Sequence, residues 1–161
     1  MNEHGVEIRE FHSGDEVDVL ALAPRLTEGV ASWRDRDDVR QAVVAWVRES
    51  IDRSADGDRA LFVAEQAGTV VGFVSVGERE HFAGEVDGYV GELVVATDEA
   101  GHGIGRLLMG RAEDWARKRG VKHLTLETGA ANAQARAFYE SLGFVEEDVR
   151  LTRRLGDWPL P

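Results

Sequence analysis

The segment Gly101-His102-Gly103-Ile104-Gly105 places three glycines in five positions, between an apolar run and a helical pattern. Glycine allows successive backbone N–H groups to converge and lets a ligand approach the main chain closely. The unpaired N–H groups of the following helix add a partial positive charge of roughly half a unit. This combination predicts an anion site, and phosphate is the usual anion at such a turn. Arg106 falls in the first helical turn, where it could reach the same anion.

Two other phosphate motifs do not fit this spacing. A dinucleotide-binding turn needs G-x-G-x-x-G and an acidic residue about twenty positions later. Glu127 suits the acidic position, but the third glycine would fall at Leu108 or at Arg106. A P-loop would close with Gly-Lys-Ser/Thr, whereas Gly105 is followed by Arg106 and Leu107. Taken alone, the turn is also compatible with a simple tight connection from strand to helix.

A second motif follows downstream and reads Asn132-x-x-Ala135-x-x-Phe138-Tyr139-x-x-Leu142-Gly143-Phe144. Together the two motifs resemble the GCN5-related N-acetyltransferase (GNAT) family, closely from Tyr89 to Phe144 and loosely elsewhere. The resemblance implies transfer of an acetyl group from acetyl-CoA to a primary amine of a small molecule, peptide or protein. It implies direct transfer in a ternary complex, with acetyl-CoA as the acyl donor and no metal.

The resemblance also implies roles for individual residues. The main chain of the strand Leu93-Val94-Val95 is expected to pair with the pantetheine arm, and Tyr139 to protonate the departing thiolate. Asn132 is expected to meet the cofactor arm, and His102 to supply only its backbone N–H. The expected diphosphate cradle consists of Gly101, His102, Gly103, Ile104, Gly105 and Arg106.

Both side chains of the downstream motif also have a structural interpretation. Asn132 stands where a helix begins, so it could be only an N-cap. Phe138 and Tyr139 are helix neighbours that point about 100° apart, so both cannot face one core stripe. Phe138 aligns with Ala135 and Leu142 as a core residue, which turns Tyr139 aside, either toward a ligand or into ordinary packing.

The general base is the least defined part of the site. Glu92 interrupts an otherwise apolar strand, where a buried carboxylate costs several kcal/mol unless it is paired or has a function. It could accept the amine proton, directly or through water, or it could be a structural acceptor. His81 is an alternative base, because an imidazole titrates near neutrality.

The chain departs from the family pattern at one position. The family turn usually opens with Arg or Gln, and Ala100 stands there, preceded by Asp98 and Glu99. One charge-assisted contact to the diphosphate is therefore missing, which predicts weaker cofactor binding than an arginine would give.

Hydrophobic periodicity predicts an α/β (α+β) fold: one mixed sheet flanked by helices, in the order β-α-α-β-β-β-α-β-α-β. A tight hairpin is expected at Ala67-Gly68 and a loop at 79–88. The expected inward residues are Val17, Leu20, Leu22, Val39, Val43, Trp46, Val47, Ile104, Leu107, Leu108, Ala112 and Trp115. The expected strands are 6–11, 61–65, 70–76, 89–96, 123–126 and 144–155; the expected helices begin near Asp15, capped by Ser13, and span 35–53, 103–119 and 133–142.

Composition limits the class of protein. The 161 residues suit a single domain over 1–161, and 43% apolar with 30% charged residues is typical of a globular chain. The absence of cysteine excludes disulfides, thiolate zinc sites and thiol nucleophiles. Neither a signal peptide nor a membrane span is expected, so the predicted location is the cytoplasm.

The net charge of −11 bears on partners. Such a field opposes nucleic acid and favours a cationic acceptor, although it could also serve solubility alone. The acceptor is expected to enter between 24–35, which includes Trp33, and the loop at 79–88. A homodimer is one expectation, since dimers are common in such families. A non-catalytic acyl-CoA sensor on the same fold is the alternative function.

Overall fold

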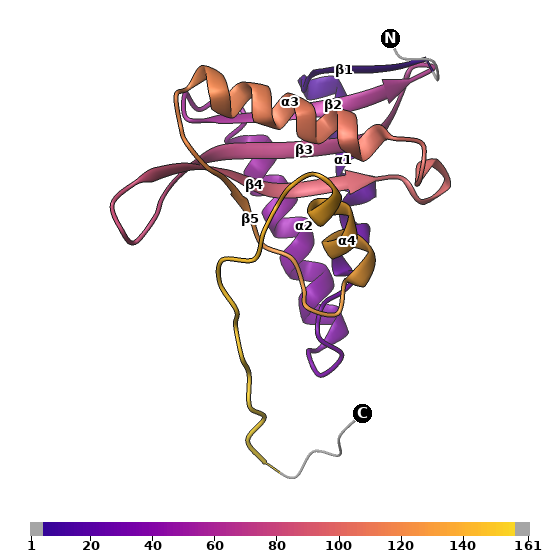
Figure 1. Ribbon diagram of the computed structural model, residues 1–161. Coiled ribbons are helices and arrows are strands. Elements are labelled where there is room, and N and C mark those ends of the chain that lie inside the picture. Colours follow the sequence, from indigo (N-terminus) through magenta and orange to yellow (C-terminus); the bar gives the residue numbers. More distant parts are fainter. Residues whose placement is uncertain (1–4, 157–161) are drawn as a thin grey trace.

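A computed structural model describes residues 5–156, which form one five-stranded sheet with helices on both faces (Figure 1). The strands lie in the sheet in chain order. Each pair from β1 to β4 is antiparallel, whereas β5 is parallel to β4. The mixed sheet predicted from the sequence is confirmed. The strands are β1 (Val6–Glu10), β2 (Arg59–Gln66), β3 (Thr69–Glu80), β4 (Val86–Val95) and β5 (Leu124–Leu126).

The helices divide between the two faces of the sheet (Figure 1). Helix α3 packs on one face, and α1 and α2 pack on the other, while α4 lies on the α3 side beside β5. No helix among residues 5–156 combines the length and apolar character that a membrane span needs. The helices are α1 (Glu16–Leu22), α2 (Arg36–Asp52), α3 (Ile104–Lys118) and α4 (Ala133–Ser141), with 3-10 turns at Ser13–Asp15, Ala23–Thr27 and Thr97–Glu99.

Each face of the sheet has its own apolar core because side chains alternate along a strand. In β3, Val74 and Val76 face α3, whereas Phe73 faces α1 and α2. Leu108 and Met109 from α3, and Val43 and Val47 from α2, are fully buried. Burying a side chain of this size stabilises the fold by about 1.5–3 kcal/mol, so the two cores hold the sheet between its helices.

Two hairpins connect β2, β3 and β4. The first turns at Ala67 and Gly68, whose φ angles of 49° and 80° suit the tight turn predicted there. The loop predicted at 79–88 is wrong in extent, because β3 continues to Glu80 and β4 begins at Val86. Residues 79, 80 and 82–86 are exposed in this hairpin, so their polarity resembled that of a loop.

Several predicted inward positions are also wrong. Val17 and Trp46 are 77% and 55% exposed, and Leu107 lies at the surface of α3, where Met109 and Ala116 are buried instead. Ser13 does not cap α1. The Asp15 carboxylate accepts the His12 N–H at 3.0 Å and is paired with Arg9, so the charged pair fixes the start of this segment.

The strand predicted at 144–155 does not form. Residues 144–156 contain no helix or strand, and Val145, Val149 and Leu151 are exposed. Alternation of apolar and charged residues predicts a strand, but a strand also needs a neighbouring edge. The strand β5 offers an edge of only three residues, which leaves this segment little to pair with.

The connector between α1 and α2 packs tightly against the start of α4. Gly29 has φ of +78°, and a Cβ built on it would lie 2.3 Å from the Cβ of Asn132. A Cβ on Gly129 would lie 2.1 Å from the carbonyl oxygen of Gly29. Two glycines therefore allow the two segments to touch through their main chains.

We expect Gly29→Ala to lower the melting temperature more than Gly120→Ala, measured by calorimetry. Gly120 has a similar φ of +74° but open space around it, so its substitution reports the backbone cost alone, about 1–2 kcal/mol. At about 2–4 °C per kcal/mol, that control should lose a few degrees, and the clash with Asn132 should add to the loss at Gly29. Equal losses would show that the close contact contributes nothing.

Candidate active site

The last two strands of the sheet, β4 and the edge strand β5, separate at their carboxyl ends. Strand β5 pairs with β4 only through Gly88–Val90, opposite Leu124–Leu126. Beyond Val90, β4 continues for five residues, and its edge toward β5 has no strand partner among residues 5–156. This exposes an open stretch of main chain beside the start of α3.

The direction of the backbone N–H groups along this stretch follows from the hydrogen bonds that β4 makes with β3. The N–H of Ala96 donates to the Val71 carbonyl of β3 at 2.8 Å, and the N–H of Glu92 donates to Ser75 of β3 at 2.9 Å. Because successive N–H groups of a strand alternate in direction, those of Leu93 and Val95 point toward the open edge. These are the two strand residues that the sequence predicts to pair with an extended ligand arm.

The glycine turn follows this strand directly. Gly101 and Gly103 have φ angles of +85° and +80°, a region that favours glycine. Gly103 is the N-cap of α3 and has no side chain to bond the first helical N–H groups. Those groups, with the helix dipole, therefore favour an anion at this end of the helix. At Gly105 a Cβ would come within 3.3 Å of the Phe138 ring, so this glycine lets α3 approach α4.

Charged side chains near the turn contact other residues of the chain. Glu99 contacts His102, with 3.2 Å between Oε2 and Nδ1. Arg106 is exposed and its guanidinium lies 3.4 Å from the Ser141 hydroxyl, across the gap between α3 and α4. Ala100 contributes no charge, so the basic group that α3 itself brings to this turn is Arg106.

Glu92 is buried between β3 and α2. The Ser50 hydroxyl of α2 donates to its Oε2 at 2.8 Å, and the Ser75 hydroxyl of β3 donates to the same oxygen. Burial raises the pKa of the Glu92 carboxyl above its usual range, and the two serine hydrogen bonds oppose this shift. The carboxyl is thus both anchored, as the structural interpretation requires, and shifted toward the pKa of a useful base.

Tyr139 lies among aromatic rings on the α3 side of the sheet. Its ring centroid is 5.3 Å from that of Phe138 and 5.8 Å from that of Phe144. No side chain or carbonyl among residues 5–156 forms a hydrogen bond with its hydroxyl. Burial raises the pKa of Tyr139, so the hydroxyl keeps its proton at neutral pH, as a proton donor must.

Two further predicted residues have structural contacts. Asn132 caps α4, since its Oδ1 accepts the Ala135 N–H at 3.1 Å, and this confirms the capping interpretation. His81 lies in the turn of the β3–β4 hairpin, where Nδ1 accepts the Ala83 N–H at 3.1 Å and Nε2 is 3.7 Å from Glu147. None of these contacts reaches Glu92 or Tyr139.

Three residues that were not predicted to belong to the site meet on one face of the sheet. The guanidinium of Arg79 lies 4.4 Å from the centroid of the Tyr89 ring and 3.2 Å from Glu127. Burial raises the pKa of Tyr89, and the Glu127 charge adds to this effect. Pairing across β3, β4 and β5 brings them together, so no local spacing in the sequence could have revealed the cluster.

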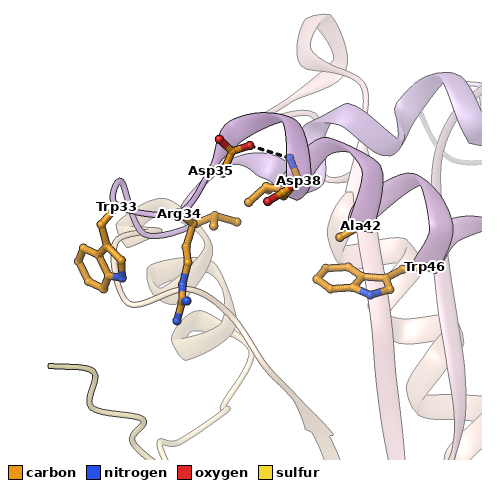
Figure 2. Close-up of a pocket in the computed structure, with 8 residues that line it drawn as sticks. Trp33, Arg34, Asp35, Asp38, Ala42 and Trp46 are labelled. Atoms are coloured by element: carbon orange, nitrogen blue, oxygen red, sulfur yellow. Dashed lines mark hydrogen bonds between the residues drawn. The ribbon is translucent and has the colours of Figure 1, made fainter. Parts of the chain in front are cut away.

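A cavity of about 450 Å³ opens between the α1–α2 connector and α2. In Figure 2, Trp33 and Trp46 lie at its two ends, and Asp35 and Asp38 lie between them. Trp46 is one helical turn before Ser50, the residue that bonds Glu92, so the cavity follows α2 toward the buried carboxyl. It is lined by Val30, Trp33, Arg34, Asp35, Asp38, Val39, Ala42 and Trp46.

The chain is similar in sequence to known acetyltransferases. A mycothiol acetyltransferase of Thermobispora bispora is 33% identical over 157 residues, covering 93% of this chain and 50% of that protein. A streptothricin acetyltransferase of Streptomyces lavendulae is 40% identical over 90 residues, covering 55% of this chain and 46% of that protein. The chain thus spans about half the length of the curated relatives it matches.

A solved structure shows the same fold. The PaiA N-acetyltransferase of Thermoplasma acidophilum, in complex with coenzyme A, superposes with a TM-score of 0.74 at 20% identity, covering 90% of this chain and 92% of that one. The model of the acetyltransferase (GNAT) family matches residues 27–144, which include the connector, the open strand, the glycine turn and α4. The chain therefore belongs to the acetyltransferase (GNAT) family.

Proposed function

We propose that this chain is an acetyl-CoA-dependent N-acetyltransferase that acts on a primary amine by direct transfer in a ternary complex. The observation that carries the proposal is the open edge of β4, which leads straight into the glycine turn at the start of α3. An extended arm ending in a diphosphate matches both parts, because the strand edge offers N–H groups and the helix start favours phosphate.

The residues that would hold acetyl-CoA follow from this match. Leu93 and Val95 offer backbone N–H groups to the pantetheine arm. Val94 lies between them, and its backbone pairs with Phe73 of β3. Asn132, which also caps α4, would contact the arm. The cradle for the diphosphate comprises Gly101, His102, Gly103, Ile104, Gly105 and Arg106.

The chemistry needs one proton removed and one supplied. The amine nitrogen forms a bond to the thioester carbonyl carbon, and the bond from that carbon to sulfur breaks. Glu92 accepts the proton from the amine, directly or through water, and the Tyr139 hydroxyl donates a proton to the leaving sulfur. A backbone N–H of the open strand stabilises the oxyanion, which is worth roughly 3 kcal/mol for one donor.

The cavity along α2 supports a cationic amine as the acceptor. Its tryptophan faces attract cations, and Asp35 and Asp38 add negative charge, although Arg34 offsets part of it. The first half of the predicted entry, 24–35, lines this cavity, whereas the β3–β4 hairpin does not. A homodimer, a location in the cytoplasm and a single domain over 1–161 stay predictions from the sequence.

The proposal is tested by incubating the protein with acetyl-CoA and a panel of amines, including aminoglycosides, polyamines and peptides, and measuring release of the CoA thiol. We expect at least one amine to give turnover, and Tyr139→Phe to slow it about 10- to 100-fold without abolishing it, since a thiolate leaves moderately well unaided. Binding of acetyl-CoA without thiol release from any amine would favour the sensor, and full activity of Tyr139→Phe would remove its role as acid.

Glu92→Gln separates a base from a structural acceptor. Because the pKa of Glu92 is raised, the carboxylate base forms at higher pH than usual, so the wild-type rate should fall as pH drops through that raised pKa. The ratio of wild-type to variant kcat/KM cancels titration of the amine itself. We expect a ratio of roughly 100 at high pH, declining toward one in acid.

The raised pKa also predicts how Glu92→Gln affects stability. Because the pKa of Glu92 is higher in the folded than in the unfolded state, its contribution to stability is lost as pH rises. The Gln side chain can still accept both serine hydrogen bonds, so this variant should not lower the melting temperature at neutral pH. A large loss of stability with a ratio independent of pH would show that Glu92 is a structural acceptor.

Ala100→Arg should tighten acetyl-CoA binding about tenfold, measured by isothermal titration calorimetry. One charge-assisted hydrogen bond to a phosphate is worth roughly 1.5–3 kcal/mol, reduced here by exposure. Ala83→Arg adds the same charge in the distant β3–β4 turn and should change the Kd little. An unchanged Kd in Ala100→Arg would show that position 100 does not face the diphosphate.

A further inference from the structure

Three potential metal ligands meet at the amino end of β4. They are Glu85 in the β3–β4 turn, Asp87 in β4 and His123 immediately before β5, and each offers one ligand atom within 4.8 Å of the other two. The cluster involves none of the residues assigned to acetyl transfer. Two of its members belong to adjacent chain segments fixed by pairing, since the Gly88 N–H donates to the His123 carbonyl at 2.9 Å.

The distances from His123 to the two carboxylates match those between neighbouring ligands of a tetrahedral site. Nδ1 of His123 lies 3.4 Å from Oε2 of Glu85 and 3.4 Å from Oδ1 of Asp87. Zinc bonds of about 2.0–2.1 Å at the tetrahedral angle place neighbouring ligand atoms about 3.3–3.4 Å apart. Both distances are longer than the roughly 2.7–3.2 Å of an ordinary N–H···O hydrogen bond.

Asp87 supplies an independent observation. Its side chain is only 9% exposed, and its Oδ1 is buried without a hydrogen-bond partner among residues 5–156. A buried carboxylate oxygen with no donor is costly, so it is expected to have a cationic partner. Arg79, directly opposite Asp87 in the sheet, does not fill this role, because its guanidinium lies over Tyr89 and pairs with Glu127.

We propose that Glu85, Asp87 and His123 bind a divalent transition-metal ion of the Zn²⁺ class. An imidazole with two carboxylates suits Zn²⁺ or Co²⁺ better than Mg²⁺ or Ca²⁺, which prefer oxygen ligands alone. Three protein ligands leave a fourth position for water. His123 is 59% exposed at its side chain, so the ion can enter from solvent. The bound ion ties the β3–β4 hairpin and β4 to the segment that leads into β5.

The test uses the untagged chain, treated with EDTA and dialysed, and titrated with Co²⁺ followed by visible absorption and with Zn²⁺ followed by calorimetry. Glu85→Gln, Asp87→Asn and His123→Gln each remove one ligand. The matched control is His12→Gln, because Nδ1 of His12 also lies 3.4 Å from an aspartate, Asp15, but that carboxylate is already paired with Arg9.

We expect one ion per chain with absorption typical of tetrahedral Co²⁺, and a higher melting temperature with Zn²⁺. Each ligand variant should weaken binding at least about tenfold, since loss of outer-shell partners alone costs that much, and His12→Gln should bind as wild type does. Glu85 lies in an exposed turn, so Glu85→Gln remains informative if Asp87→Asn fails to fold. The proposal would be overturned if the wild-type chain bound no metal ion. It would also be overturned if both Glu85→Gln and His123→Gln bound the ion as tightly as the wild type does.

Discussion

The candidate site depends on the short pairing of β4 with β5. A sheet normally satisfies the main-chain groups of its inner strands from both sides, and β4 receives this from β5 only over Gly88–Val90. The remaining N–H groups on that edge lie open, at the same end of the strand as the helix start of α3. Had the pairing continued to Val95, the sheet would be more regular and the site would be closed. The fold thus leaves backbone N–H groups of β4 without a strand partner, and a ligand can bond them there.

An irregularity on the other side of β4 accompanies this separation. The register between β3 and β4 shifts at Ser75, which faces Gly91 and Glu92 together. The Ser75 hydroxyl accepts the Glu92 N–H and donates to the Glu92 carboxylate, so one side chain bonds both parts of the bulged residue. A Cβ on Gly91 would lie 2.8 Å from the same hydroxyl, which leaves little room for any other residue there. Bulges redirect side chains, and here the carboxyl is directed toward Ser50 of α2.

The parts of this arrangement that could be predicted from the sequence are those coded by local spacing. The glycine turn, the helix after it and the motif around Tyr139 are read from neighbouring residues, and the structure has each in the expected element. The Arg79–Tyr89–Glu127 cluster and the contact of Gly29 with Asn132 join residues far apart in the chain, so no spacing encodes them. The strand expected at 144–155 failed for a related reason, since its pattern was right but pairing depends on a distant edge.

Charge gives the last constraint on the site. A chain with a net charge of −11 repels a polyanion at long range, so any diphosphate must be held by short-range forces. Backbone N–H groups at the start of α3 act over a few ångströms and cannot be neutralised by the acidic residues around them. Glu99 also has its contact with His102, beside the turn. The same acidic surface attracts a protonated amine, and the cavity beside α2 carries Asp35 and Asp38. Under the proposed function, main-chain dipoles recognise the anionic donor and the field of the side chains attracts the cationic acceptor, so an acidic protein can bring the two together.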